Sequence, residues 1–286
     1  MSYDVLVIGG GPAGLSASIN VRARGRSALV VSNPLEENPL WRAEKVDNYL
    51  GLPGVTGTEL LEQFRRHAEE LGADFVLGRV ISLMAWNGFH LTVGSEIYEG
   101  ETLILAPGVV RQAKYPGETE YLGRGVSYCA TCDGMLYRGK PVAVVGRSGD
   151  APREASYLKS LGCQVVYVSP QEPKGLDREI PFVRAGKLEV RGTDRVSALV
   201  ADGAELPCEG VFILRDALAP TDLLPDLELR NGAIAVDREM ATSLPGVFAA
   251  GDCTGGPLQV AKAVGEGHTA GLSAAEYVDR KRNEHQ

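Results

Sequence analysis

The feature that most constrains the fold is an internal repeat of one sequence pattern. DVLVIGGGPAGLSASI (residues 4–19) and PVAVVGRSGDAPREAS (141–156) each run from a β-branched apolar stretch through a glycine-containing turn into a helical start. A second apolar strand follows each segment, SALVV at 27–31 and QVVYV at 164–168. Strand–helix–strand units of this kind predict parallel sheets flanked by helices. The repeat therefore predicts an α/β fold with two Rossmann-like, three-layer domains.

The C-terminal part of the chain indicates how the two domains are connected. GVFAAGD at 246–252 is an apolar strand that runs into glycine, and a helix rich in small residues follows it, in the style of the first repeat. No linker rich in proline and glycine separates the chain into two halves. The sequence therefore predicts a second domain inserted into the first, with residues 1–112 and 243–286 in one domain and residues 113–242 in the other.

Composition and charge exclude several classes of protein. The chain has 286 residues and a formal net charge of −8, whereas nucleic-acid and membrane-surface binders normally carry a basic excess. No apolar run reaches the ~20 residues of a membrane helix, and the N-terminal MSYDVLVIGG lacks the basic start of a signal peptide. Five cysteines, an odd number in a chain of this length, do not indicate a disulfide scaffold. We therefore expect a cytoplasmic protein with neither nucleic-acid nor membrane partners.

The first repeat carries a dinucleotide-binding pattern in the correct context. Gly9, Gly11 and Gly14 form G-x-G-x-x-G between a strand and a helix. The first glycine permits a tight turn, the second lets the backbone approach a pyrophosphate, and the third allows close packing of strand and helix. The usual acid about 20 residues later is replaced by Ser32-Asn33, whose side chains can still bond ribose hydroxyls. A glycine-rich turn that binds nothing is the alternative.

A second polar position follows the strand GVFAA. Gly251-Asp252 lies between that strand and the last predicted helix. The carboxylate of Asp252 can accept hydrogen bonds from a polyol such as the ribityl chain of a flavin. The alternative is an ordinary acid at a helix N-terminus.

One pair of cysteines, Cys129 and Cys132, is spaced C-x-x-C. Half of a zinc site is one interpretation, but no second C-x-x-C and no paired histidines accompany it, so we expect no metal. A redox pair fits better, because two cysteines three apart can close a small disulfide ring and such thiols often have a lowered pKa at a helix N-terminus. The next residue, Asp133, could transfer a proton to or from a thiol.

The motif SYCATCDG, together with GGGPAG, TSLPGVFAAGD and the final helix with Gln259, resembles the low-molecular-weight thioredoxin reductases over residues 3–278. The resemblance implies a homodimeric FAD protein whose FAD-binding domain is split around the inserted domain. It also implies that Cys132 faces the flavin, that Cys129 attacks the disulfide of thioredoxin, and that Asp133 is the proton donor. The candidate cofactor residues are then Gly9, Gly11, Pro12, Ala13, Gly14, Ser32, Asn48, Ala106, Pro107, Gly108, Gly251, Asp252, Gln259 and Val260.

The second repeat departs from the family at its nucleotide-binding turn. Ser148 stands where the relatives have the glycine that lets a pyrophosphate approach, with Arg147 and Asp150 beside it. The relatives hold the 2′-phosphate of NADPH with a histidine and arginines, which are absent from SPQEPKG at 169–175. Their later glycine-containing loop is LRDALAP here, at 214–220. The inserted domain therefore resembles a degenerate NADPH-binding domain.

A subgroup of the family that lacks these nucleotide motifs takes electrons from reduced ferredoxin, and the chain resembles that subgroup. Residues 111–160 hold eight Lys or Arg and five acids, compatible with a basic face for an acidic ferredoxin or thioredoxin. The expected activity is ferredoxin-dependent reduction of thioredoxin through FAD and the cysteine pair. The alternatives are an NAD(P)H-dependent thioredoxin reductase, a reductase with a second flavin, and a redox sensor without turnover. Cys163, Cys208 and Cys253 are expected to be inert packing residues, with Cys253 placed near the predicted flavin by its neighbour Asp252.

Overall fold

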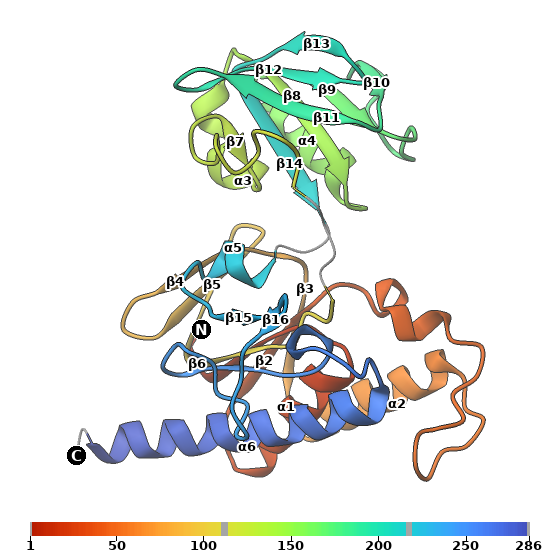
Figure 1. Cartoon of the computed structure of the whole chain (residues 1–286), viewed down its shortest axis with the longest axis vertical. Coiled ribbons are helices and arrows are strands. Elements are labelled where there is room, and N and C mark those ends of the chain that lie inside the picture. The colour runs from red at the N-terminus through yellow and green to blue at the C-terminus, as the bar shows by residue number, and fades with distance from the viewer. Residues whose placement is uncertain (1, 110–113, 216–218, 285–286) are drawn as a thin grey trace. The chain divides into compact units, whose positions relative to one another are not determined.

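The computed structural model describes residues 2–109, 114–215 and 219–284. The chain divides into two compact units (Figure 1): unit 1 comprises Met1–Val110 with Ala217–Gln286, and unit 2 comprises Arg111–Asp216. One unit is thus inserted into the other, in the manner that the C-terminal strand and helix indicate. Among the helices in the described ranges, none is both long enough and apolar enough to cross a membrane.

The described residues of unit 1 form a seven-stranded mixed sheet with the order β3-β2-β1-β6-β5-β4, in which β17 also pairs with β6. The pairs among β1, β2, β3, β6 and β17 are parallel, whereas β4, β5 and β6 pair antiparallel. The strands are β1 Ser2–Ile8, β2 Ala28–Ser32, β3 Asp74–Leu77, β4 Val80–Ala85, β5 Phe89–Val93, β6 Glu96–Leu105 and β17 Val247–Ala249. The other elements are α1 Pro12–Ala23, η1 Leu35–Glu37, η2 Pro39–Arg42, α2 Gly57–Glu70, α5 Pro220–Leu223, β15 Leu229–Arg230, β16 Ala233–Ile234, η4 Asp252–Thr254 and α6 Val260–Glu284.

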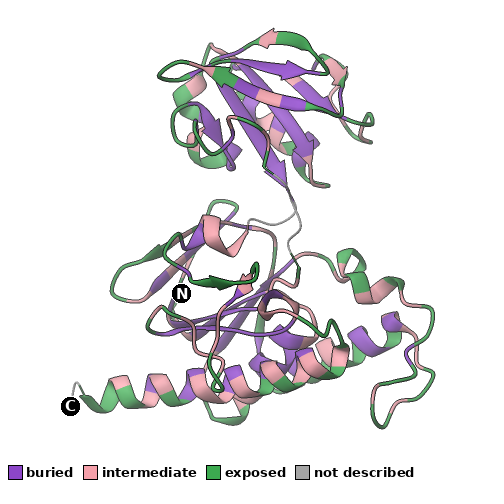
Figure 2. Ribbon diagram, in the orientation of Figure 1, coloured by how far each residue is buried: buried purple, intermediate pink, exposed green. Residues whose placement is uncertain are grey.

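The core of unit 1 explains how a split domain closes. The buried side of the sheet packs on α1 and α6, and Figure 2 shows the parallel strands buried along most of their length. On α6, a Cβ at Gly267 would lie 2.1 Å from the Ala13 carbonyl oxygen, and one at Gly271 would lie 2.4 Å from that of Ala17. Only glycine allows so close an approach. Small residues on the last helix therefore let it pack directly on the first, which joins the two ends of the chain.

The predicted second boundary of the inserted domain, after residue 242, is wrong. The boundary between the units lies after Asp216, and the described residues 219–242 pack on unit 1. Helix α5 contacts β4, strand β16 contacts η4, and Ala241 forms a β-bridge with Phe248. These contacts join segments that are distant in sequence, and composition does not change where the chain re-enters unit 1.

Unit 2 repeats the design of unit 1 on a smaller scale. Its described residues form a parallel sheet with the order β10-β9-β8-β14-β7 and an antiparallel sheet with the order β11-β12-β13. Helix α4 packs on β8 and β9, and the short helix α3 packs on α4. The elements are β7 Val126–Ser127, α3 Ala130–Asp133, η3 Gly134–Tyr137, β8 Pro141–Arg147, α4 Ala151–Ser160, β9 Gln164–Ser169, β10 Phe182–Arg184, β11 Leu188–Gly192, β12 Val196–Ala201, β13 Ala204–Pro207 and β14 Gly210–Arg215. Both predicted βαβ units are thus present, which confirms the predicted α/β class with Rossmann-type domains.

Candidate active site

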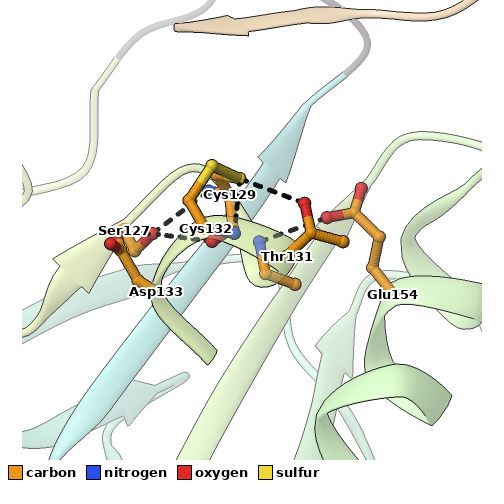
Figure 3. The surroundings of a disulfide bond; sticks show 7 residues. Ser127, Cys129, Thr131, Cys132, Asp133 and Glu154 are labelled. Carbon is orange, nitrogen blue, oxygen red and sulfur yellow. Dashed lines mark hydrogen bonds between the residues drawn. A yellow bond between two sulfur atoms is a disulfide. The ribbon is translucent and has the colours of Figure 1, made fainter. Parts of the chain in front are cut away.

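The C-x-x-C pair forms a disulfide at the start of α3. The Cα atoms of Cys129 and Cys132 lie 5.3 Å apart, and Cys129 is the N-cap residue of the helix (Figure 3). The backbone N–H of Cys132 donates to the Sγ atom of Cys129 at 3.0 Å. A sulfur at this position faces the positive end of the first helical turn, which stabilises a thiolate once the disulfide is reduced.

Asp133 is held beside the disulfide by a residue that the sequence analysis did not select. The hydroxyl of Ser127 donates to Asp133 Oδ2 at 2.7 Å and accepts from the backbone N–H of Cys129 at 3.1 Å (Figure 3). The same hydroxyl lies 3.2 Å from the carbonyl oxygen of Cys129. Ser127 thus links the candidate proton donor to the backbone of the redox pair. The SYC sequence contains this serine, but only the fold shows which way its side chain points.

A second carboxylate reaches the redox helix from α4. Glu154 Oε2 accepts from the backbone N–H of Ala130 at 3.4 Å, and the Thr131 hydroxyl lies 3.4 Å from Cys129 Sγ (Figure 3). Glu154 belongs to the second repeat, 24 residues beyond Ala130 in sequence. Helix α4 of the second βαβ unit therefore helps to hold the redox helix, a role that its sequence pattern does not reveal.

The two cysteines differ in exposure. Cys129 is 4% exposed within the described chain, whereas Cys132 is exposed at the surface of unit 2. Immediately after the pair, Met135 and Leu136 of η3 are 57% and 69% exposed. Exposed apolar side chains beside a reactive disulfide offer contact area to a protein substrate.

In unit 1, the candidate cofactor residues lie where Rossmann folds bind ligands. Gly9 follows β1, Ser32 ends β2, Ala106 follows β6 and Gly251 lies beyond the end of β17, so all four lie at the carboxyl edge of parallel strands. Ligands of open α/β sheets bind at this edge. The structure thus brings together four positions spread over 242 residues of sequence, from 9 to 251.

The glycine-rich turn fits a bound dinucleotide. A Cβ at Gly9 would lie 2.1 Å from the Ala106 carbonyl oxygen, and one at Gly14 would lie 1.9 Å from that of Gly9, so both positions are closed to larger residues. At Gly11, in contrast, the nearest atom is Asn38 Nδ2 at 3.1 Å. The turn leads into α1, with Pro12 in its first turn and no side chain capping its N-terminus. Free N–H groups there can bind the pyrophosphate of FAD.

Ser32 provides an independent indication of a ligand. Its hydroxyl is buried and has no hydrogen-bond partner in the described structure. A Cβ at Gly10 would lie 2.8 Å from this oxygen, so the hydroxyl faces the glycine-rich turn. Buried polar groups are almost always bonded. A ribose hydroxyl of FAD at this place would satisfy Ser32, as its position at the end of β2 predicts.

Two further candidate residues, which lie 211 positions apart in the sequence, contact each other in unit 1. Asn48 Nδ2 donates to Gln259 Oε1 at 2.6 Å, and both side chains are exposed. The carbonyl oxygen of Gln259 accepts from Ala263 N–H at 3.0 Å, and α6 begins at the neighbouring Val260. The remaining candidates, Ala13, Pro107 and Gly108, lie in α1 and in the segment after β6. Gly108 has a positive φ of 71°, which favours glycine.

A lysine and a glutamate missed by the sequence analysis shape the loop that carries Asp252. Lys262 Nζ donates to the carbonyl oxygens of Gly251 and Gly255 at 2.7 and 2.6 Å and lies 3.0 Å from Glu266. Glu266 in turn accepts from the backbone N–H of Gly251 at 2.8 Å. Burial raises the pKa of Asp252, Lys262 opposes this shift, and Glu266 adds to it. We call Lys262 and Glu266 the α6 clasp.

The three other cysteines are packing residues, in agreement with the prediction. All are buried, and burial raises their pKa values: Cys208 to about 11, Cys253 to about 12, and Cys163 above its ordinary value. Cys253 Sγ donates to the carbonyl oxygens of Ala250 and Leu105 at 3.3 and 3.5 Å. A thiol of this kind stays protonated at neutral pH and is a poor nucleophile.

At the corresponding edge of unit 2, Tyr115, Arg147 and Arg215 of the described chain lie against one another. Arg147 and Arg215 pair in register at the carboxyl ends of β8 and β14. Arg147 Nε donates to the Tyr115 hydroxyl at 2.7 Å, and the guanidinium carbon of Arg215 lies 5.3 Å from the centre of the same ring. The retained Gly146 packs against the Tyr167 side chain on the neighbouring strand, since a Cβ there would lie 1.8 Å from the Tyr167 hydroxyl oxygen. At the corresponding carboxyl edge of the sheet in unit 1, the residues are Gly9 and Ala106.

Three of the eight basic residues of the segment 111–160 form ion pairs with acids. Lys140 lies 3.3 Å from Glu209 and Arg153 lies 3.4 Å from Asp150. Lys159 lies 2.6 Å from both Asp177 and Glu179. Most of these acids come from outside the counted segment, which is why a local count overestimates the charge. Arg111, one of the eight basic residues, lies outside the described residues.

Comparisons with known proteins agree with this geometry. Residues 3–267 match the family described as pyridine nucleotide-disulphide oxidoreductase. A thioredoxin reductase from Aquifex aeolicus is 34% identical over 305 aligned residues, which cover 98% of this chain and 94% of the relative. A ferredoxin-flavin thioredoxin reductase from Clostridium acetobutylicum is similar in structure, with a TM-score of 0.88, 39% identity, and coverage of 98% of this chain and 99% of that one.

A thioredoxin reductase from Gloeobacter violaceus gives a TM-score of 0.79 at 33% identity, with coverage of 100% of this chain and 95% of that one. Proteins of this family are FAD-binding flavoproteins, and the glycine-rich turn and the buried, unbonded Ser32 hydroxyl of unit 1 fit that cofactor. The fold, the candidate cofactor edge of unit 1 and the disulfide of unit 2 all lead to one assignment. This chain belongs to the pyridine nucleotide-disulphide oxidoreductase family and is a homologue of its thioredoxin reductases.

Proposed function

We propose that this protein is a flavin-dependent disulfide reductase that takes electrons from reduced ferredoxin and delivers them to thioredoxin through Cys129 and Cys132. The Cys129–Cys132 disulfide, with Asp133 held beside it through Ser127, supports the reductase activity. The relatives named as thioredoxin reductases supply the class of substrate. Ferredoxin is the finer part of the proposal, and a different observation supports it.

The cluster of Tyr115, Arg147 and Arg215 at the sheet edge of unit 2 is the observation that carries the choice of electron donor. A dinucleotide would have to displace the Tyr115 ring and two arginine side chains, one of which is buried. Ser148 stands in the turn where backbone should meet the pyrophosphate, and the Tyr167 hydroxyl packs against Gly146 just before it. The structural relative named as a ferredoxin-flavin thioredoxin reductase supports the same donor.

The chemistry balances with one-electron donors. Bound FAD can accept electrons singly and release them as a pair. Two reduced ferredoxins therefore supply the two electrons that, with two protons, convert the Cys129–Cys132 disulfide into two thiols. One thiolate then attacks the thioredoxin disulfide, and the second thiol breaks the mixed disulfide, which restores the Cys129–Cys132 bond and leaves thioredoxin as a dithiol. Asp133 is placed to supply or accept a proton at the sulfurs.

Anaerobic mixing of the flavin-loaded protein with each donor tests the proposal. Reduced ferredoxin is expected to bleach the flavin absorbance and, with oxidised thioredoxin present, to generate thioredoxin dithiol. An equal concentration of NADPH or NADH is expected to leave the flavin oxidised. Dithionite is the control that shows that the flavin can be reduced. Rapid bleaching by stoichiometric NADPH, with no response to ferredoxin, would establish the pyridine-nucleotide alternative instead.

Two further points of the assembly follow from the same proposal. The described Tyr115, Arg147 and Arg215 side chains lie at the edge of unit 2 where a second flavin would bind, so we expect one FAD per chain when the released cofactor is counted against protein. The resemblance to thioredoxin reductases implies a homodimer, which light scattering of the holoprotein measures. A ratio of two FAD per chain would favour the two-flavin alternative. Thioredoxin left oxidised by ferredoxin and this protein together would favour a redox sensor.

A further inference from the structure

A buried ion pair in unit 2 takes no part in the disulfide chemistry described above. Glu118 is fully buried and accepts hydrogen bonds from both terminal nitrogens of Arg215, at 2.5 and 2.7 Å. The Tyr128 hydroxyl and the backbone N–H of Tyr115 also donate to this carboxylate, each at 2.9 Å. Burial alone would raise the pKa of Glu118, but these hydrogen bonds and the charge of Arg215 outweigh it and hold the pKa below its ordinary value. The carboxylate is ionised and bonded on both oxygens.

This network reaches the redox pair through Tyr128. Tyr128 immediately precedes Cys129, and its hydroxyl is bonded to Glu118. On the other side, the Ser127 hydroxyl accepts from the backbone N–H of Cys129 at 3.1 Å. Consecutive side chains at the end of β7 thus point to opposite sides, one to the ion pair and one to the redox helix. The backbone just before Cys129 is anchored on both sides.

We propose that Arg215 is a positioning residue for the disulfide chemistry, which acts through Glu118 and Tyr128 to hold Cys129 at the N-terminus of α3 when the disulfide is open. In the oxidised chain, the S–S bond itself fixes Cys129. Reduction by two electrons and two protons gives two thiols and removes that tether. The anchored backbone then keeps the sulfur of Cys129 near the N–H of Cys132, 3.0 Å away in the disulfide form, where a thiolate is stabilised.

Arg215 lies in the segment 214–220 that replaces the glycine-containing loop of the relatives. A residue that fills the lost nucleotide site thereby supports the redox pair. Asp133 on α3 and Glu154 on α4 are charged groups beside the redox helix, and neither is substituted in the variants below. The proposal rests on Cys129 and Cys132 being the redox pair of the proposed function, and it does not depend on the electron donor or on thioredoxin.

The test uses the full-length, FAD-loaded protein and two variants. Tyr128→Phe removes one hydrogen bond and keeps the ring. The paired variant Glu118→Gln with Arg215→Gln removes both charges together, so that neither charge is left buried alone. Equilibration in glutathione redox buffers at neutral pH, followed by thiol alkylation and mass spectrometry, measures the balance between disulfide and dithiol. Both variants are expected to shift that balance toward the disulfide by about three- to tenfold, because the thiolate loses stabilisation.

A second measurement reports on the reactivity of the Cys129 sulfur alone. In a Cys132→Ser background, Tyr128→Phe is expected to slow the reaction of Cys129 with iodoacetamide by a similar factor. Tyr121→Phe is the matched control, because Tyr121 is also buried and its hydroxyl donates to the Gly192 carbonyl oxygen at 2.9 Å, away from the network. Wild-type values for Tyr128→Phe in both readouts, with unchanged circular dichroism, overturn the proposal. Equal shifts in the Tyr121→Phe control also overturn it, because they indicate general loosening. If the paired variant does not fold, Tyr128→Phe decides alone.

Discussion

At the scale of single residues, the two cysteines combine opposite properties. Cys129 is nearly buried but faces the N–H of Cys132, whereas Cys132 is exposed and its sulfur receives no such hydrogen bond in the described structure. The resemblance assigns attack on thioredoxin to Cys129, which is the better stabilised thiolate, while exposure alone would favour Cys132. The question is whether stabilisation of the thiolate or exposure of the sulfur determines which cysteine attacks thioredoxin.

We predict that stabilisation of the thiolate determines the choice, so that Cys129 attacks thioredoxin. The variant Cys132→Ser keeps Cys129 and the backbone N–H at position 132, and we expect it to react about tenfold faster than Cys129→Ser with a thioredoxin whose single remaining cysteine carries an aromatic thiol leaving group. The rate of colour release measures the reaction, and the mixed disulfide is identified by mass spectrometry. Flavin content in both variants controls for folding. A faster reaction of Cys129→Ser would assign the attack to Cys132.

At the scale of secondary-structure elements, the first turn of α6 supports the loop that carries the candidate cofactor residue Asp252. Lys262 is a cation at a helix N-terminus, where the helix dipole disfavours positive charge. Its hydrogen bonds to the carbonyl oxygens of Gly251 and Gly255, together with Glu266, offset that cost. The α6 clasp therefore holds the loop of Asp252, while Gly267 and Gly271 further along the helix hold α6 on α1. One helix both closes unit 1 and shapes its ligand-binding edge.

We predict that Lys262→Met weakens FAD binding by tenfold or more, because two carbonyl oxygens and Glu266 lose their cation, at about 1.5–3 kcal/mol for each charged hydrogen bond. The dissociation constant is measured from the fluorescence of free FAD in equilibrium dialysis. Lys281→Met, near the other end of α6, is the matched control and should bind FAD like the parent protein. Unchanged affinity in Lys262→Met would show that the clasp does not support the cofactor.

At the scale of the whole molecule, each unit contains its own core and its own half of the chemistry. The candidate FAD residues all belong to unit 1, and the disulfide with Ser127, Asp133 and Glu154 belongs to unit 2. The hydrophobic clusters are likewise separate, one around β1 and α6 and another around β8 and α4. Domains with separate cores can fold separately.

We predict that unit 1 folds and binds FAD without unit 2. Replacement of residues 111–216 by a flexible Gly/Ser linker is expected to give a chain with a cooperative thermal transition and about one FAD bound, but without disulfide reductase activity. Absorbance of bound flavin and calorimetry measure the two properties. An aggregated or flavin-free product, when the parent protein prepared in parallel retains FAD, would show that unit 1 depends on unit 2 for its stability.

The sequence by itself determined the features that depend on short-range pattern. The two βαβ units, the strand–glycine–helix turn at Gly9 and the redox pair at Cys129 follow from residues close together in the chain, since period-two apolar runs, turn glycines and C-x-x-C spacing act locally. The substitutions at Ser148 and in segment 214–220 showed that the second turn is altered. Local pattern could not locate the boundary after Asp216, because the chain re-enters unit 1 without a change of composition.

The tertiary structure alone decided which distant residues meet. Asn48 bonds Gln259 across 211 residues, Glu118 pairs with Arg215 across 97, and Lys159 is neutralised by Asp177 and Glu179. The carboxyl ends of parallel strands converge at one sheet edge only after the sheet has formed, so a cluster there has no signature in a window of sequence. For the same reason, the sequence showed that a nucleotide-binding turn was spoiled, whereas only the fold showed that arginine and tyrosine side chains fill the space.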